Sequence, residues 1–195
     1  MIGYTSYKNN SERCKLSSIL KYIFVISCFL LCLIRNFAFL YDTQVRLLLF
    51  ALFFTVCADY FLIFTDKILT GILLFVLVQL CYWFFLGGTW ISLQKGLLLL
   101  TLFLLPLAYF SEILIFPAVL YLGCLCANIR LAQKHKKYSA LSGLTLLFLC
   151  DVHLGLANLP LYISLPSSAC YSFAARILWF FYLPSQLLLS LSARK

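Results

Sequence analysis

The stretch 51-ALFFTVCADYFLIFTDKILTGILLFVLVQLCYWFFL-86 decides the fold of this chain, because it holds two long apolar runs separated by only three residues. Each run approaches the roughly 20 residues that an α-helix needs to cross a bilayer. The separator, residues 65–67, is too short for anything but a tight turn. The sequence therefore predicts an antiparallel hairpin of two membrane-spanning helices, over about 46–65 and 68–86.

Apolar runs of similar length recur along the chain of 195 residues, of which 64% are hydrophobic and only 11% charged. Soluble domains carry about a quarter charged residues, so the composition indicates a membrane protein. The runs are continuous and rich in Leu and Phe, which favours helices over the alternating strands of a barrel. We therefore predict an all-α fold, a polytopic transmembrane helical bundle of about seven spans. The remaining spans are expected at about 18–40, 90–110, 113–130, 139–157 and 174–192.

The chain is expected to form one domain with a short tail. Residues 1–17 are predicted to be a polar, basic N-terminal tail, and residues 18–195 a single transmembrane helical bundle domain. We interpret the first apolar run as a retained span, because it is longer than the apolar core of a signal peptide and no small-residue cleavage site follows it. Pro106 and Pro117 are expected to kink their helices, since proline removes a backbone donor. The apolar, Pro-containing segment 158–169 is expected to be an interfacial or re-entrant segment.

The net charge of +9 does not indicate a nucleic-acid partner. The Lys and Arg residues are spread over span ends and loops rather than along one stripe. We expect an integral, multi-pass membrane location, which is the cell membrane if the source is bacterial. The basic flank of the first span favours an N-terminus inside the cell, although the basic loop RLAQKHKK at 130–137 favours the reverse.

Metal and cofactor chemistry is not indicated by the sequence. Nine cysteines occur without a C-x-x-C pair, and the chain has two histidines. Buried free cysteine behaves as a small apolar side chain, and two histidines far apart in the sequence do not make a His-rich metal centre. The motifs of serine hydrolases, zinc proteases and nucleotide-binding loops are missing. We therefore expect no metal and no organic cofactor.

Two of the six acids, Asp59 and Asp151, fall inside predicted spans. An aspartate near the bilayer centre costs roughly 2.5 to 3.5 kcal/mol, and such residues normally face the bundle interior and mark function. We therefore predict that both carboxyl groups point inward. In the structural alternative, Asp59 pairs with Arg35 or Lys21 and only ties helices together. Other polar side chains are candidates for the same inward patch: Gln79, Tyr82, Asn158, Tyr182 and Gln186.

The stretch 51–86 resembles the YhhN-like membrane family, which includes the lysoplasmalogenases. That family has a small residue followed by Asp in one helix and, after a short loop, a helix with Gly, Phe and His-x-x-Tyr. The stretch 146-LLFLCDVHLGL-156 is similar to a late Ser-Asp motif of the family, and 176-RILWFFYLPSQLLLSLS-192 to its closing helix. The matching positions here are Ala58-Asp59, Gly71, Phe75, Gln79-x-x-Tyr82, Cys150-Asp151, Tyr182 and Gln186.

The resemblance implies an integral-membrane hydrolase that acts on a membrane lipid or lysophospholipid. Family members typically have eight spans, and they cleave the vinyl-ether bond of lysoplasmalogens, with an ethanolamine or choline head group, to a fatty aldehyde and a glycerophospho-alcohol. A carboxylic acid can protonate the vinyl ether, and a second carboxylate can stabilise the cation and activate water. We expect Asp59 to be the acid and Asp151 the charged partner, with the reverse assignment still open.

The expected substrate-binding residues are drawn from the same comparison. Gln79 and Tyr82 are expected to position substrate or water, and Asn158, Tyr182 and Gln186 to line the pocket. Gln79 stands where the family has His, so no proton transfer is assigned to it. The sequence does not determine the oligomeric state.

Two other classes of function use the same residues. A non-catalytic lipid-binding protein or a proton-coupled small-molecule carrier could employ both aspartates, and a carrier would show a continuous polar path across the bundle. A purely structural subunit would hold the two acids far apart, each paired with its own base. The enzyme hypothesis instead requires both carboxyl groups to share one interior site.

Overall fold

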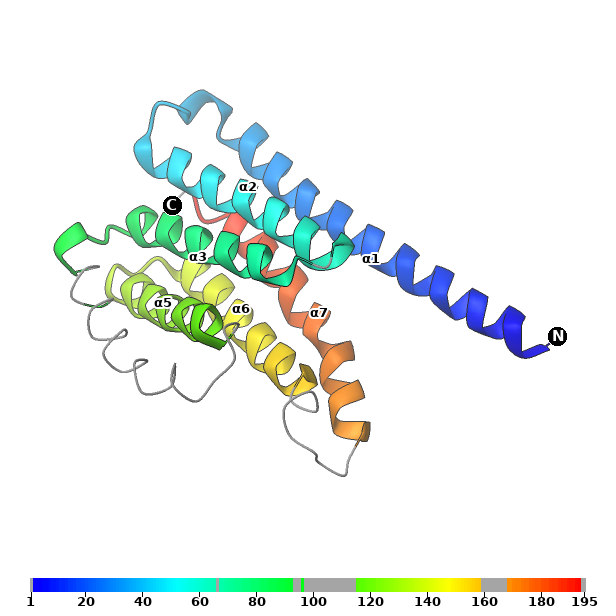
Figure 1. The fold of residues 1–195 in the computed structure, drawn as a ribbon. Coiled ribbons are helices and arrows are strands. Elements are labelled where there is room, and N and C mark those ends of the chain that lie inside the picture. The colour runs from blue at the N-terminus through cyan, green and yellow to red at the C-terminus, as the bar shows by residue number, and fades with distance from the viewer. Residues whose placement is uncertain (1, 66, 93–95, 97–114, 159–167, 194–195) are drawn as a thin grey trace.

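A computed structural model describes residues 2–65, 67–92, 96, 115–158 and 168–193, and side chains within them at 18–65, 67–92, 96, 116–155 and 178–193. Over the described residues the regular structure is entirely helical (Figure 1), which confirms the predicted all-α fold class. The elements are α1 (Ile2–Arg35), η1 (Phe37–Phe39), α2 (Thr43–Phe64), α3 (Ile68–Phe85), α5 (Ile115–Lys134), α6 (Tyr138–Asn158) and α7 (Ser168–Ser190).

Five helices among the described residues are long and apolar enough to cross a membrane. They confirm that the chain is a multi-pass membrane protein with a helical bundle. The described apolar part of α7, Leu178–Ser190, is shorter than a full span. The predicted span 90–110 lies outside the described residues except for 90–92 and 96, so the number of seven spans stays a prediction. The five spans are Ser18–Arg35, Thr43–Phe64, Ile68–Phe85, Phe116–Lys134 and Tyr138–Gly155.

The first predicted span, 18–40, ends too late. Helix α1 begins at Ile2, and its membrane-spanning part is Ser18–Arg35, so the predicted start of the span is confirmed. The helix ends at Arg35, and the chain then turns into η1. The Cys32 carbonyl in the last turn accepts from both the backbone N–H and the side-chain amide of Asn36, at 3.1 and 2.8 Å.

The α2–α3 hairpin agrees closely with its prediction. Helix α2 begins three residues earlier than expected, because the Asp42 carboxylate caps it by accepting from the backbone N–H of Gln44 at 2.9 Å. Gly71 lets α3 approach α2 closely, since a Cβ there would lie 2.6 Å from Leu62 Cγ. The hairpin therefore depends on a small residue at its closest approach.

Within the described part of the chain, α5 runs from Ile115 to Lys134 and so continues past Pro117. The kink expected at Pro117 stays a prediction. Pro106 and most of the predicted interfacial segment 158–169 lie outside the described residues.

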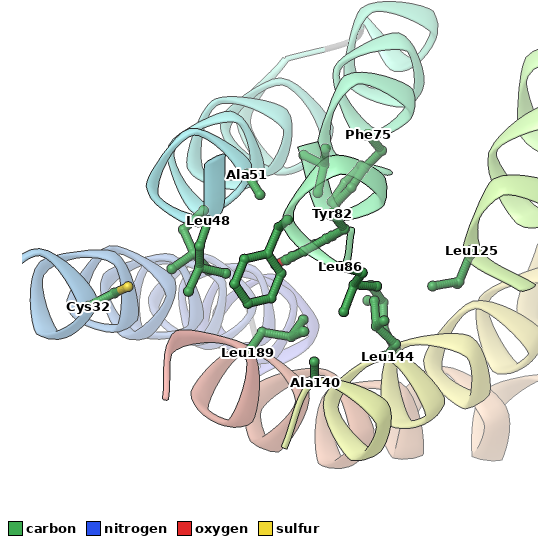
Figure 2. Close-up of a cluster of buried hydrophobic side chains, with 14 of the residues drawn as sticks. Cys32, Leu48, Ala51, Phe75, Tyr82, Leu86, Leu125, Ala140, Leu144 and Leu189 are labelled. Carbon is green, nitrogen blue, oxygen red and sulfur yellow. The ribbon is translucent and has the colours of Figure 1, made fainter. Parts of the chain in front are cut away.

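The helices are arranged as a ring (Figure 1). Along the chain α1 packs on α2, α2 on α3, α3 on α5, α5 on α6 and α6 on α7, and α7 returns to contact α1. Side chains from all of these helices meet in the interior, as the close-up in Figure 2 shows for part of the buried core. The labelled core residues there are Cys32, Leu48, Ala51, Phe75, Tyr82, Leu86, Leu125, Ala140, Leu144 and Leu189.

One end of the bundle is fastened by hydrogen bonds between helix ends. The ammonium group of Lys137 donates to the Phe85 carbonyl at 2.7 Å and to Gln44 Oε1 at 3.3 Å. The Ser139 hydroxyl donates to the Leu188 carbonyl at 2.9 Å. These bonds bring together four helix ends: the starts of α2 and α6 and the ends of α3 and α7. We call this region of the bundle the basic end, because Lys and Arg residues gather there.

Candidate functional site

Asp59 lies on the buried face of α2, at helical spacing from Leu52 and Thr55. It is only 5% exposed. The Tyr182 hydroxyl donates to Asp59 Oδ2 at 2.6 Å and so joins α7 to α2 across the interior. The Thr55 hydroxyl donates to the Ala51 carbonyl instead of the carboxylate. Both Asp59 and Tyr182, predicted as inward-facing residues, are buried in this interior.

Asp151 takes part in a second pair of the same kind. The Tyr121 hydroxyl of α5 donates to Asp151 Oδ2 on α6 at 2.7 Å. Tyr121 also packs its ring on Phe75 of α3, with ring centroids 5.7 Å apart. Sequence reasoning missed Tyr121, because a tyrosine in an apolar span has no distinctive neighbours. Its only available signal was the helical spacing of Tyr121 and Asn128 on one face of α5.

The two aspartate–tyrosine pairs belong to one cluster. The Asp59 and Asp151 carboxyl groups are close enough to interact electrostatically, and the Cys150 thiol is close enough to interact with both. The two tyrosine hydroxyls, Tyr182 and Tyr121, interact in the same way. We call Asp59, Tyr182, Asp151, Tyr121 and Cys150 the acid cluster. Five side chains from four helices, α2, α5, α6 and α7, therefore meet inside the ring.

The predicted structural alternative receives no support from the arrangement of basic residues. Arg35 ends α1 and is exposed. The Lys21 ammonium group lies over the Trp179 ring, 4.3 Å from its centroid. Among the described residues, Asp59 and Asp151 each accept a hydrogen bond from a tyrosine. Their carboxyl groups also interact electrostatically, so they do not lie on opposite flanks of the molecule.

A pair of buried amides lies next to this cluster in the ring. The Asn128 amide donates to the Gln79 carbonyl at 2.9 Å and to Gln79 Oε1 at 2.8 Å, which joins α5 to α3. Both residues are fully buried. Gln79 Nε2 and Asn128 Oδ1 have no hydrogen-bond partner among the described residues, and the same holds for Gln186 Oε1. An unsatisfied buried polar group costs about 1–3 kcal/mol, so these atoms are candidates for a hydrogen bond to a molecule that enters the interior.

The other predicted site residues have different positions. Tyr82 is 1% exposed, and its hydroxyl lies close to the Cys28 and Cys32 thiols of α1. Figure 2 shows Tyr82 among the apolar core side chains, in the same cluster as Cys32. Gln186 is buried one turn after Tyr182 on α7. The side chain of Asn158 lies outside the described residues.

His153 packs against its own helix and against α7. Its Nδ1 lies 2.7 Å from the Leu149 carbonyl, and its ring contacts Phe181 with centroids 5.0 Å apart. Within the described chain no group of three His, Cys, Asp or Glu side chains is arranged to hold a metal ion. The chemistry that the described interior offers is therefore that of carboxyl, phenol and amide groups.

Comparison with known proteins finds no family model, curated protein or solved structure that matches this chain. The resemblance of 51–86 to the YhhN-like family therefore stays a prediction. Function has to be argued from the site itself, from the side chains that meet in it and the chemistry they allow.

Proposed function

We propose that this protein is an integral-membrane hydrolase in which Asp59 and Asp151 cleave the vinyl-ether bond of a lysoplasmalogen. The single observation that carries the proposal is the meeting of two aspartate–tyrosine pairs inside one helical ring. Asp59 is buried and Asp151 is half-buried; two such carboxyl groups that interact with each other, each bound by a tyrosine, resemble the paired acids of glycoside hydrolases. Both reactions pass through an oxocarbenium-like cation.

The chemistry requires one proton donor and one charged carboxylate. Asp59 transfers its proton to the vinyl carbon β to the ether oxygen, and the positive charge on the α-carbon is shared with that oxygen. A water molecule then attacks: the water oxygen bonds to the α-carbon while Asp151 takes a proton from the water. The hemiacetal then collapses: its hydroxyl proton returns to Asp59, the Asp151 proton goes to the glycerol oxygen, and the C–O bond breaks. The products are a fatty aldehyde and a glycerophospho-alcohol.

The tyrosines position the two acids in this mechanism. Tyr182 and Tyr121 each bind the Oδ2 atom of one carboxyl group, which leaves the second oxygen of each for substrate or water. A hydrogen bond to a charged carboxylate also stabilises it. The single free glycerol hydroxyl of the lipid would find a partner in the unpaired atoms of Gln79 or Gln186. Tyr82 and Asn158 are assigned to the remaining wall of the substrate site.

The test uses purified full-length protein in detergent micelles with lysoplasmenylethanolamine, and it measures released aldehyde. We expect Asp59→Asn and Asp151→Asn each to lower the rate by about a hundredfold or more, as loss of a general acid or base does. Asp42→Asn is the matched control, because Asp42 is an exposed helix cap that asparagine can replace. The alkyl-ether analogue, which has no double bond to protonate, should release nothing.

Two results would count against the proposal in different ways. Absence of aldehyde release by the wild type refutes the vinyl-ether substrate. Release that is undiminished in either aspartate variant refutes the assigned mechanism while leaving the substrate in place.

A second candidate function is a proton-coupled carrier. Buried polar side chains continue along α7 beyond the acid cluster, through Ser185, Gln186 and Ser190, and a carrier needs polar groups along its path. In sealed proteoliposomes a carrier would move protons across the membrane with its solute, and Asp59→Asn would stop this transport. A protein that transports protons but releases no aldehyde would establish this function in place of the hydrolase.

We propose further that the N-terminus lies inside the cell, in the cell membrane if the source is bacterial. The basic flank of the first span, with Lys8, Arg13 and Lys15, supports this orientation under the positive-inside rule. Protease treatment of right-side-out vesicles should leave an N-terminal tag intact. Cleavage of that tag would reverse the assignment.

A further inference from the structure

A cavity of about 500 Å³ lies at the basic end of the bundle, between the end of α3 and the last turns of α5. Its α3 wall includes Trp83, Gly87 and Gly88, and its α5 wall includes Arg130 and Lys134. Arg130 and Lys134 lie on the side of α5 opposite Tyr121 and Asn128, because their positions differ by about half a helical turn. The cavity is therefore separate from the acid cluster and faces the outside of the ring.

The α3 wall of the cavity is held in a fixed shape. Gly87 has φ of 92°, and the backbone N–H groups of Gly87 and Gly88 donate to the carbonyls of Phe84 and Trp83 at 3.1 and 2.8 Å. This is the pattern of a Schellman cap, which ends the helix and satisfies its last carbonyls. A Cβ at Gly88 would overlap the Trp83 indole, whose Nε1 donates to the Thr89 carbonyl at 3.3 Å.

The charge of the cavity is positive and unbalanced. Arg130, Lys134 and His135 come from the end of α5, and the described lining residues include no acid. In the described part of the chain no ion pair neutralises Arg130 or Lys134, which are both exposed. Hydroxyl groups of Thr89 and Ser92 are hydrogen-bonded to each other at 2.8 Å in the same lining. Guanidinium, ammonium and hydroxyl donors together match the oxygens of a phosphate group.

The position of the cavity indicates where that phosphate comes from. The membrane-spanning helices α3 and α5 both end beside it, at Phe85 and Lys134. Trp83 lines it, and Trp90 packs on Phe84 nearby with ring centroids 4.7 Å apart. Tryptophans gather at the depth of the lipid head groups. Basic pockets between spans at that depth bind the head groups of anionic lipids.

We propose that the cavity formed by the end of α3 and the Arg130–Lys134 face of α5 binds the phosphate group of an anionic phospholipid in the adjacent leaflet. The site is independent of the proposed hydrolase chemistry, since it shares no side chain with the acid cluster. A bound lipid there would contact two spans and the loop after α3 at once.

The experiment measures retained lipid on full-length protein by native mass spectrometry, from micelles with equal amounts of phosphatidylglycerol and phosphatidylcholine. The wild type should retain phosphatidylglycerol preferentially. Replacing both Arg130 and Lys134 by Gln should weaken that retention about thirtyfold, since each cation near a membrane surface contributes about fivefold. The matched control removes two exposed arginines of the same end outside the cavity, Arg35→Gln with Arg46→Gln, and should leave retention unchanged.

A second variant keeps the charge and changes the shape. Ala127→Phe adds a ring to the cavity wall and should also lower retention of phosphatidylglycerol, with the unfolding temperature as the check that the protein is folded. In a further arm of the experiment, the binding of inorganic phosphate and of glycerol phosphate to the protein is measured in micelles without anionic lipid.

Each remaining outcome overturns the proposal. Equal losses in the Arg130/Lys134 pair and in the control pair would mean non-specific attraction to the basic end. Equal retention of phosphatidylcholine, which has a phosphate but no net charge, would mean that the site does not recognise an anionic phospholipid. Binding of inorganic phosphate as tight as that of the lipid would mean that the ligand is a soluble phosphate.

Discussion

Replacing Tyr182 by Phe removes one oxygen atom from the bundle interior, the hydroxyl that donates to Asp59 Oδ2 at 2.6 Å. A hydrogen bond between neutral groups, as with a protonated Asp59, contributes about 0.5–1.5 kcal/mol in soluble proteins, and interhelical hydrogen bonds in membranes average about 0.6 with a maximum near 1.7 kcal/mol. Asp59 is 5% exposed, so water does not easily replace the lost donor. We expect the free energy of unfolding to fall by about 1–2 kcal/mol.

The assay is reversible unfolding by denaturing detergent in mixed micelles, with two tyrosine-to-phenylalanine controls that remove the same atom elsewhere. Tyr60 is 47% exposed one residue from Asp59, and Tyr60→Phe should change the free energy of unfolding little. The buried Tyr82 hydroxyl has no hydrogen-bond partner in the described chain, so Tyr82→Phe should be neutral or stabilising. A buried hydroxyl without a partner carries an unrecovered desolvation cost.

The test is the comparison of the unfolding free energies of the three variants. The contacts predict that only Tyr182→Phe is destabilised. An unfolding free energy of Tyr182→Phe equal to that of Tyr60→Phe would show that the Tyr182–Asp59 hydrogen bond does not hold α7 to α2.

Three further changes test the packing around the site, each by the same unfolding assay. Lys136 has φ of 54°, a left-handed conformation that glycine adopts without strain, so Lys136→Gly should stabilise by about 0.5–1 kcal/mol. At Gly143 a Cβ would lie 2.8 Å from Leu189 Cγ and 3.2 Å from the Leu189 backbone N, so Gly143→Ala should cost about 1–3 kcal/mol by overpacking α6 against α7. Asn128→Leu leaves Gln79 without its amide partner and should cost about 1–3 kcal/mol.

Each of these changes has a control in the chain. Gln133→Gly, in the last turn of α5 where φ is ordinary, should destabilise by roughly 1 kcal/mol, opposite in sign to Lys136→Gly. Gly155→Ala, where a Cβ meets nothing within 4 Å, should cause no loss. For Asn128 the control is the double variant with Gln79→Leu, which should recover part of the loss because both polar partners are then removed. The packing argument would be contradicted if Gly155→Ala lowered the free energy of unfolding as much as Gly143→Ala. The argument for the amide pair would be contradicted if the losses from Asn128→Leu and Gln79→Leu were additive.

The fold class could be predicted from the sequence because lipid exposure imposes a simple pattern. Long apolar runs can bury their backbone polar groups only as helices, and the limits of α2 and α3 agree with their prediction to within three residues. The predicted end of the first span was wrong by several residues, since the apolar run continues past Arg35 whereas the helix ends there. Apolar composition does not indicate where a turn such as η1 begins.

The candidate site could be predicted only in part. Asp59 was found because a carboxylate inside an apolar span is conspicuous, and Tyr182 was found as one of the polar side chains of its span. Tyr121 and Asn128 were missed, because their importance comes from partners 30 and 49 residues away. Tyr82 was assigned to the site, and its hydroxyl is close enough to interact with Tyr121 as well as with the Cys28 and Cys32 thiols of α1. Side-chain direction depends on helix rotation, which a single sequence does not determine.

The central claim is that Asp59 and Asp151 act as one unit inside the ring, and a double-mutant cycle on aldehyde release tests it most directly. The rates to compare are those of the wild type, Asp59→Asn, Asp151→Asn and the doubly substituted protein. Residues that act together in one step are strongly non-additive, so we predict that the second substitution lowers the rate little beyond the first. Losses that multiply, or a rate unaffected by one of the two substitutions, would contradict a shared site.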